Sequence, residues 1–115
     1  METGYATRFG VRDSELRGLV GGILSAEELL ATADVVLLPK PEHADLQRMH
    51  EGQTLWGWPH LVQDPVATQI AVDKGLTILA WEAMHTVGGG TARPQHVFHA
   101  NNELAGYSSV MHAMQ

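Results

Sequence analysis

The chain contains no cysteine, which excludes disulfides, zinc–thiolate sites and cysteine nucleophiles. It has no apolar run near the ~20 residues that a membrane-spanning helix requires. Lys and Arg number only 7 against 13 Asp and Glu, and they are scattered along the sequence, so the formal net charge is -6. A general nucleic-acid binder normally carries the opposite charge or a basic patch. We therefore expect neither a nucleic-acid partner nor a membrane span.

The composition is typical of a globular protein, with 44% hydrophobic and 17% charged residues. A length of 115 residues suits one domain and leaves little room for separate cofactor and substrate domains. The first four residues resemble neither a signal peptide nor a transit peptide. The expected location is therefore cytoplasmic.

Short apolar runs alternate with amphipathic stretches along the chain, which is typical of α/β architecture. The Ser25–Glu28 capping box and the Asp64–Pro65 pair each predict the start of a helix. Because alternating strands and helices imply right-handed crossovers, we expect a parallel, Rossmann-like (flavodoxin-like) sheet in a three-layer α/β/α arrangement. The predicted strands cover residues 34–38, 54–58 and 76–81. The first of them is a continuous apolar run that reads as buried on both faces. The predicted helices cover residues 13–20, 26–33, 42–50 and 65–74, with a last helix capped by Asn101 or Asn102 and running to the end of the chain.

Three polar residues, Lys40, His60 and Glu82, directly follow the predicted strands. Ligands of parallel sheets bind beyond the carboxyl ends of the strands, so this pattern places them on one rim. Lys40, between two prolines, could hold a carboxylate or polarise a carbonyl, or it could be a solvated loop lysine. His60 could serve as an acid/base near neutral pH or simply pack against Trp58. Glu82 is more readily explained as a loop or cap carboxylate.

The remaining motifs indicate no metal and no cofactor site. The spacing of His96 and His99, like that of His43 and His50, does not match a zinc signature. The three glycines at 88–90 lack the pattern of a dinucleotide or phosphate loop, which favours a flexible loop. Apolar residues recur at helical spacing near the C-terminus, which predicts a packing face formed by Leu104, Tyr107, Val110, Met111 and Met114.

Several segments in order resemble one family. These are residues 33–40, 51–55, 60–61, 77–82 and 103–107. Together they are similar to the N-terminal domain of the alanine dehydrogenase and pyridine nucleotide transhydrogenase family. Residues 57–60 and 105–113 most resemble its carboxyethylornithine synthase branch, which reduces the imine formed between a keto acid and an amine.

The resemblance implies roles for two residues. Lys40 matches a lysine that contacts the keto acid, and His60 matches a histidine that acts as acid/base. The family reads Lys-Glu-Pro where this chain has Lys40-Pro41-Glu42. We expect one substrate-binding domain over residues 1–115, incomplete at its N-terminus. Residues 101–115 would begin an interdomain helix, and the nucleotide-binding domain would be absent.

The resemblance thus predicts the substrate-binding domain of an oxidoreductase that acts on 2-keto or 2-amino acids with NAD or NADP. Without a nucleotide domain, the isolated chain is expected to bind no cofactor and to be inactive. The expected partners are a small keto acid or amino acid, together with a nucleotide-binding domain or second subunit on the C-terminal helix, in a homo-oligomer. The alternative is a stand-alone, non-catalytic domain that binds a small molecule or a partner chain.

Overall fold

The computed structural model describes residues 1–87 and 94–115. They form two compact units, residues 1–80 and residues 81–115. The triple glycine at 88–90, expected to be a flexible loop, lies outside the described residues. None of the helices in the described part of the chain has the length and apolarity needed to cross a bilayer.

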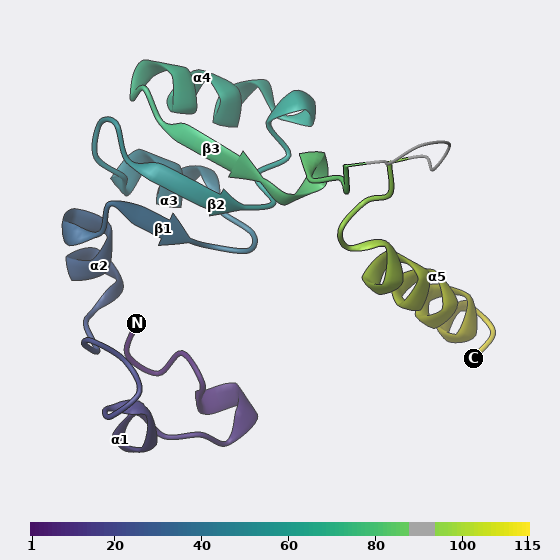
Figure 1. Ribbon diagram of the computed structural model, residues 1–115, viewed down its shortest axis with the longest axis horizontal. Coiled ribbons are helices and arrows are strands. Elements are labelled where there is room, and N and C mark those ends of the chain that lie inside the picture. The colour runs from purple at the N-terminus through teal and green to yellow at the C-terminus, as the bar shows by residue number, and fades with distance from the viewer. Residues whose placement is uncertain (88–93) are drawn as a thin grey trace. The chain divides into compact units, whose positions relative to one another are not determined.

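The first unit is built around a parallel sheet of three strands in the order β1-β2-β3 (Figure 1). This confirms the predicted α/β class and the parallel pairing. Strands β1 and β2 are connected through α3, and β2 and β3 through η2 and α4. The elements of this unit are η1 (Thr7–Phe9), α1 (Asp13–Leu16), α2 (Ala26–Thr32), β1 (Val35–Leu37), α3 (His43–Arg48), β2 (Thr54–Gly57), η2 (Leu61–Gln63), α4 (Pro65–Asp73) and β3 (Thr77–Ala80).

One face of the sheet carries the hydrophobic core. Val36, Leu55 and Ile78 are register partners across the three strands and point to this face. Leu55 is fully buried, and the helices cover it with residues of the same core cluster. Because consecutive strands connected by right-handed crossovers place their helices on the same side, α3 and α4 pack against each other here. The buried helical residues of the cluster are Leu30, Leu46 and Ala67, with Met49 just after α3.

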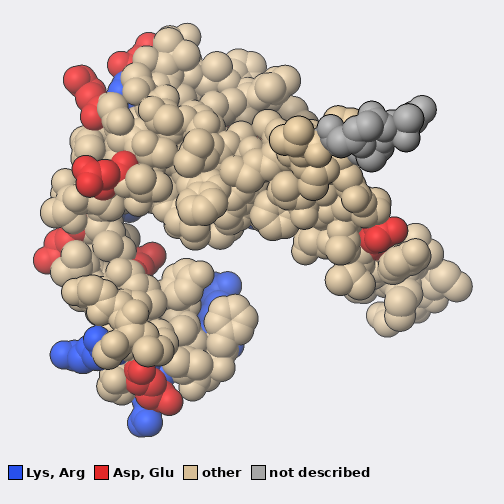
Figure 2. All heavy atoms as spheres, viewed as in Figure 1, with Lys and Arg blue, Asp and Glu red and all other residues tan. Residues whose placement is uncertain are grey.

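The opposite face of the sheet is open. Leu37, Trp56 and Leu79 form the next cross-strand row and are 52%, 38% and 42% exposed. Figure 2 shows almost entirely uncharged side chains over the three strands on this side. The prediction that residues 34–38 are buried on both faces is therefore wrong, because within residues 1–80 a helical layer covers one face only. Of the three expected layers, the described part of this unit has two.

Helix starts in this unit follow the predicted caps. The Ser25 hydroxyl accepts from the Glu28 amide, and the Glu28 carboxylate accepts from the Ser25 amide, so the capping box forms as expected. Asp64 caps α4 ahead of Pro65, and α4 is followed by Gly75, at φ +58°. The first predicted helix stops at Leu16, short of its expected end at residue 20.

Two buried or half-buried polar side chains join these elements, and neither was predicted. Gln53 is 1% exposed and donates to the carbonyls of Leu30 and Ala33, which are otherwise free at the end of α2. Its own carbonyl accepts from the His50 amide. The Lys74 ammonium donates to the Met49 carbonyl, linking the ends of α4 and α3. These bonds hold α2, α3 and α4 at the end of the sheet opposite Lys40 and His60.

The second unit contains η3 (Trp81–Ala83) and the long helix α5 (His99–Ala113). The helix begins before Asn101, because the Asn102 amide already donates to the Phe98 carbonyl. Phe98 is the N-cap, so the prediction of an asparagine cap is wrong. The predicted apolar face of α5 is exposed, with 61–82% of each residue accessible at Leu104, Tyr107, Val110, Met111 and Met114.

Candidate functional site at the carboxyl ends of the strands

Lys40 and His60 lie on two loops that a backbone hydrogen bond joins. The ladder between β1 and β2 continues past Leu37, where the Leu38 amide donates to the Trp56 carbonyl at 3.0 Å. The Trp58 amide then donates to the Pro39 carbonyl at 2.9 Å. Lys40 directly follows Pro39, and His60 comes two residues after Trp58. The parallel sheet thus brings the backbones of both predicted site residues to one rim.

Gly57 makes this close approach possible. A Cβ added at residue 57 would lie 2.0 Å from the Leu38 carbonyl oxygen and 2.9 Å from its carbon. Both neighbours are backbone atoms, so no side-chain rotation could relieve the clash. Only glycine fits at the point where the two loops meet, and this explains the glycine in the Gly-Trp-Pro-His segment.

His60 has an unusual backbone conformation. It lies in the left-handed region at φ 50° and ψ 36°, and is the one non-glycine residue with a positive φ among residues 1–87 and 94–115. A side chain in this region costs about 1–2 kcal/mol, so the surrounding structure must hold it there. Pro59 before it is buried, and the His60 carbonyl accepts from the Gln63 amide at 2.9 Å. The imidazole itself is on the surface.

Lys40 is exposed, and its ammonium group makes no hydrogen bond or ion pair with the residues that the structure describes. The other lysine, Lys74, is bound to the Met49 carbonyl. The two flanking prolines at 39 and 41 restrict the backbone of Lys40. A cation on a stiff loop without a protein partner can accept an anionic ligand with little rearrangement.

A His–Asp pair that was not predicted connects the same two loops. His43 Nε2 lies 2.6 Å from Asp64 Oδ2. The other carboxylate oxygen of Asp64 accepts from the amides of Val66 and Ala67. The Ala67 amide first, and then His43, hold the pKa of Asp64 below its usual value. The sequence indicated Asp64 as a helix cap, but no local signal pointed to a partner 21 residues away.

The other polar candidates, Glu82, His96 and His99, belong to the second unit. Glu82 is half-buried in η3 of the second unit. The His96 ring packs edge-on against the His85 ring with centroids 5.2 Å apart, and His99 lies 3.7 Å from Glu103. Over the described ranges, no group of three or more His, Asp or Glu side chains could hold a metal ion.

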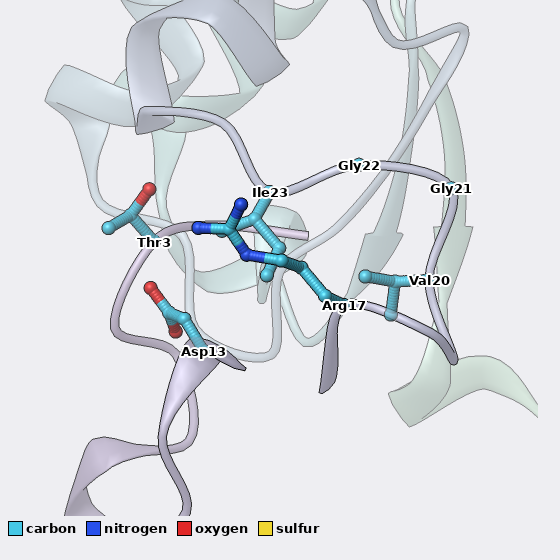
Figure 3. A pocket seen from close by; sticks show the side chains of 7 residues that line it. All are labelled: Thr3, Asp13, Arg17, Val20, Gly21, Gly22 and Ile23. Carbon is cyan, nitrogen blue, oxygen red and sulfur yellow. The ribbon is translucent and has the colours of Figure 1, made fainter. Parts of the chain in front are cut away.

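Two hollows of the first unit are lined by residues other than Lys40 and His60. One, of about 380 Å³, is lined by the N-terminal segment and by the stretch after α1. Figure 3 shows Arg17 reaching across it, near Thr3 and Asp13. The Asp13 carboxylate already accepts from the Gly4 amide with both oxygens, at 3.0 and 3.1 Å. The second, of about 400 Å³, is an apolar groove along the outer edge of β1. Neither hollow includes either rim residue.

The junctions that follow β1 and β2 lack the kind of turn that commonly binds a dinucleotide. Its pyrophosphate is normally bound by backbone amides of a glycine-rich turn at a helix start. Here the junction after β1 carries Pro39 and Pro41, and the junction after β2 carries Pro59 and Pro65. Proline has no amide hydrogen to donate, so neither junction can form that turn.

No protein-family model matches the chain. Three curated proteins do. NAD(P) transhydrogenase subunit alpha of Cereibacter sphaeroides is 28% identical over 98% of this chain. N(5)-(carboxyethyl)ornithine synthase of Clostridium botulinum is 27% identical over 99% of it, and alanine dehydrogenase of Mycobacterium tuberculosis is 28% identical over 79%. The predicted family resemblance is confirmed. The chain spans 22%, 39% and 25% of the lengths of these three proteins.

Proposed function

We propose that this chain is the 2-keto-acid-binding part of an NAD(P)-dependent oxidoreductase of the alanine dehydrogenase and transhydrogenase type. The observation that carries the proposal is the hydrogen bond between Trp58 and Pro39, which brings the Lys40 and His60 loops together at one rim. The names of the relatives support the oxidoreductase class and the use of NAD(P) by the parent enzyme. The dinucleotide would be bound by another domain or chain, because the described junctions do not fit it.

In this proposal Lys40 binds the keto acid. Its ammonium would pair with the carboxylate or lie against the carbonyl oxygen, where it would stabilise developing negative charge. His60 would donate and accept the proton at that oxygen while the carbonyl is converted to an amine-bearing carbon and back. Histidine is the side chain that most often serves as general acid and general base in enzymes.

The surface position of both side chains has a consequence for the proposal. Charge interactions at an open rim are screened by water, and they strengthen when a cleft closes and excludes it. We therefore expect this chain alone to bind a keto acid weakly. The partner that supplies the dinucleotide would also cover the rim.

The experiment is a titration of the isotope-labelled chain with pyruvate, followed by amide and histidine ring NMR signals. Pyruvate should shift the signals of Lys40, Trp58 and His60 first. Acetate, which has the carboxylate but no ketone, should bind more weakly. Lys40→Ala should weaken pyruvate binding about tenfold or more, because a charge-assisted hydrogen bond contributes ~1.5–3 kcal/mol.

Two further variants separate the chemistry from the structure. His60→Asn retains a residue that tolerates the left-handed conformation while removing the imidazole, so weakened binding would report the ring rather than backbone strain. Arg48→Ala removes an exposed cation from the last turn of α3 and should leave binding unchanged. Equal binding by the natural chain, the Lys40 variant and the His60 variant would refute the proposal.

A second candidate function is the non-catalytic binding of a partner chain. It is favoured by the exposed apolar row Leu37–Trp56–Leu79 and by the exposed face of α5. Light scattering of the chain at rising concentration tests it, and Tyr107→Glu on α5 should reduce any self-association. A chain that binds no pyruvate but associates through the exposed face of α5 would favour partner binding over keto-acid binding.

A further inference from the structure

We propose that His43 is a positioning residue that holds the two loops of the rim in a fixed position relative to each other. The hydrogen bond from its ring to Asp64 fixes the loop of Lys40 relative to the loop of His60. The effect of this bond on keto-acid binding rests on the proposed function, whereas its effect on the loops does not.

The positions of the two partners make this bond a second attachment between the loops. His43 is the first residue of α3, three residues after Lys40, and Asp64 is the N-cap of α4, four residues after His60. The first attachment, from Trp58 to Pro39, lies on the strand side of both site residues. Each site residue is thus enclosed between two points at which its loop is tied to the other. One attachment would leave the loops free to pivot, and two define their orientation.

The carboxylate of Asp64 is suited to this role because its two oxygens have separate partners. Oδ1 accepts from the amides of Val66 and Ala67 at 3.1 and 3.0 Å, and Oδ2 is left for His43 at 2.6 Å. The backbone of Asp64 is fixed as well, since its amide donates to the Leu61 carbonyl at 3.1 Å.

The same Leu61 carbonyl accepts from the Thr68 hydroxyl in α4, at 2.6 Å. Hydrogen bonds therefore connect the η2 turn to the His60 carbonyl on one side and to Thr68 of α4 on the other. Movement of the carboxylate would be passed back to the strained backbone of His60. His43 can act on His60 in this way without touching the ligand.

Hydrogen exchange of individual amides measures this effect without any ligand. The reporters are the amides of Trp58 and Gln63, which donate to Pro39 and to His60. The reference is the amide of Thr77, which donates to the Gln53 carbonyl at the far end of the sheet. In His43→Ala we expect the reporters to exchange about tenfold faster and the reference to remain within about twofold, because local opening is confined to the affected segment.

Conservative and control variants complete the design. His43→Gln should restore most of the protection, because its amide can still donate to Asp64. His50→Ala removes a histidine that lies two residues beyond the other end of α3 and whose ring is hydrogen-bonded to the carbonyl of its neighbour Glu51. This variant should change neither reporter. Pyruvate affinity should fall about fivefold in His43→Ala and recover in His43→Gln.

The outcomes are distinguishable. Unchanged exchange at Trp58 and Gln63 in His43→Ala would overturn the positioning role, and so would equal acceleration at all three amides, which would report global destabilisation. Local acceleration in a chain that binds no pyruvate would support the positioning role and refute the proposed function. Local acceleration together with weakened pyruvate binding would support both.

Discussion

Gly57→Ala is expected to separate the two loops of the rim. The added Cβ would lie 2.0 Å from the Leu38 carbonyl oxygen, whereas ordinary contact begins at 3.4 Å, so the oxygen must retreat by about 1.4 Å. Such a shift strains the bond from Leu38 to Trp56 and breaks the bond from Trp58 to Pro39. Overpacking of this kind costs ~1–3 kcal/mol, and the lost hydrogen bond adds ~1 kcal/mol. We expect a total loss of unfolding free energy of ~2–4 kcal/mol.

Thermal unfolding followed by circular dichroism measures this loss. For a domain of this size the melting temperature should fall by about 10–25 °C. Gly18→Ala is the matched control in the same unit, because nothing lies within 4 Å of a Cβ at that position and its φ is not in the left-handed region. Where Gly57→Ala still folds, the Trp58 amide should lose its protection from exchange. A melting temperature within about 2 °C of the natural chain would refute the close approach of the loops.

Three further predictions concern the core, the acid stability and the cofactor. Leu55→Ala, at the fully buried centre of the core row, should lower the unfolding free energy by ~2–5 kcal/mol, measured by urea denaturation. Asp64 should make stability depend on pH in acid. Its pKa is lowered by the Ala67 amide and then by His43, so its contribution is complete above its unfolded pKa of about 3.9 and is lost as pH falls through the lower folded pKa. Asp64→Asn, which keeps a capping oxygen but cannot titrate, should flatten melting temperature against pH between about pH 5 and pH 2. Calorimetry of the chain with NADH or NADPH should detect no micromolar binding. A clear micromolar affinity would contradict the inference that the proline-containing junctions cannot bind a pyrophosphate.

The parts of the fold that local chemistry determines could be predicted from the sequence. The Ser25–Glu28 capping box and the Asp64–Pro65 start depend on residues within three positions of each other, and both form as expected. The three strands and their parallel order follow from the alternation of apolar runs and helices. The resemblance to the dehydrogenase and transhydrogenase family could also be read from short segments in order.

Features set by contacts between distant segments could not be predicted in this way. The apolar run at 34–38 looks the same whether one or both faces of the strand are covered, so the exposure of Leu37 did not follow from it. The bond between His43 and Asp64 and the bond from Gln53 to the end of α2 join residues 20 or more positions apart. The left-handed backbone of His60 carried no signal, because glycine or asparagine would have been the usual indication.

The open face of the sheet offers an optical reporter. Trp56 lies at the centre of its cross-strand row and is 38% exposed, so its indole is in partial contact with water. Any layer that covered this face, from a second domain, another protein or a detergent micelle, would move that indole into an apolar environment. Its fluorescence should then shift to shorter wavelength and become less accessible to a soluble quencher such as iodide. With Trp58 and Trp81 replaced by phenylalanine, the remaining emission of the purified chain would record the covering of this single face.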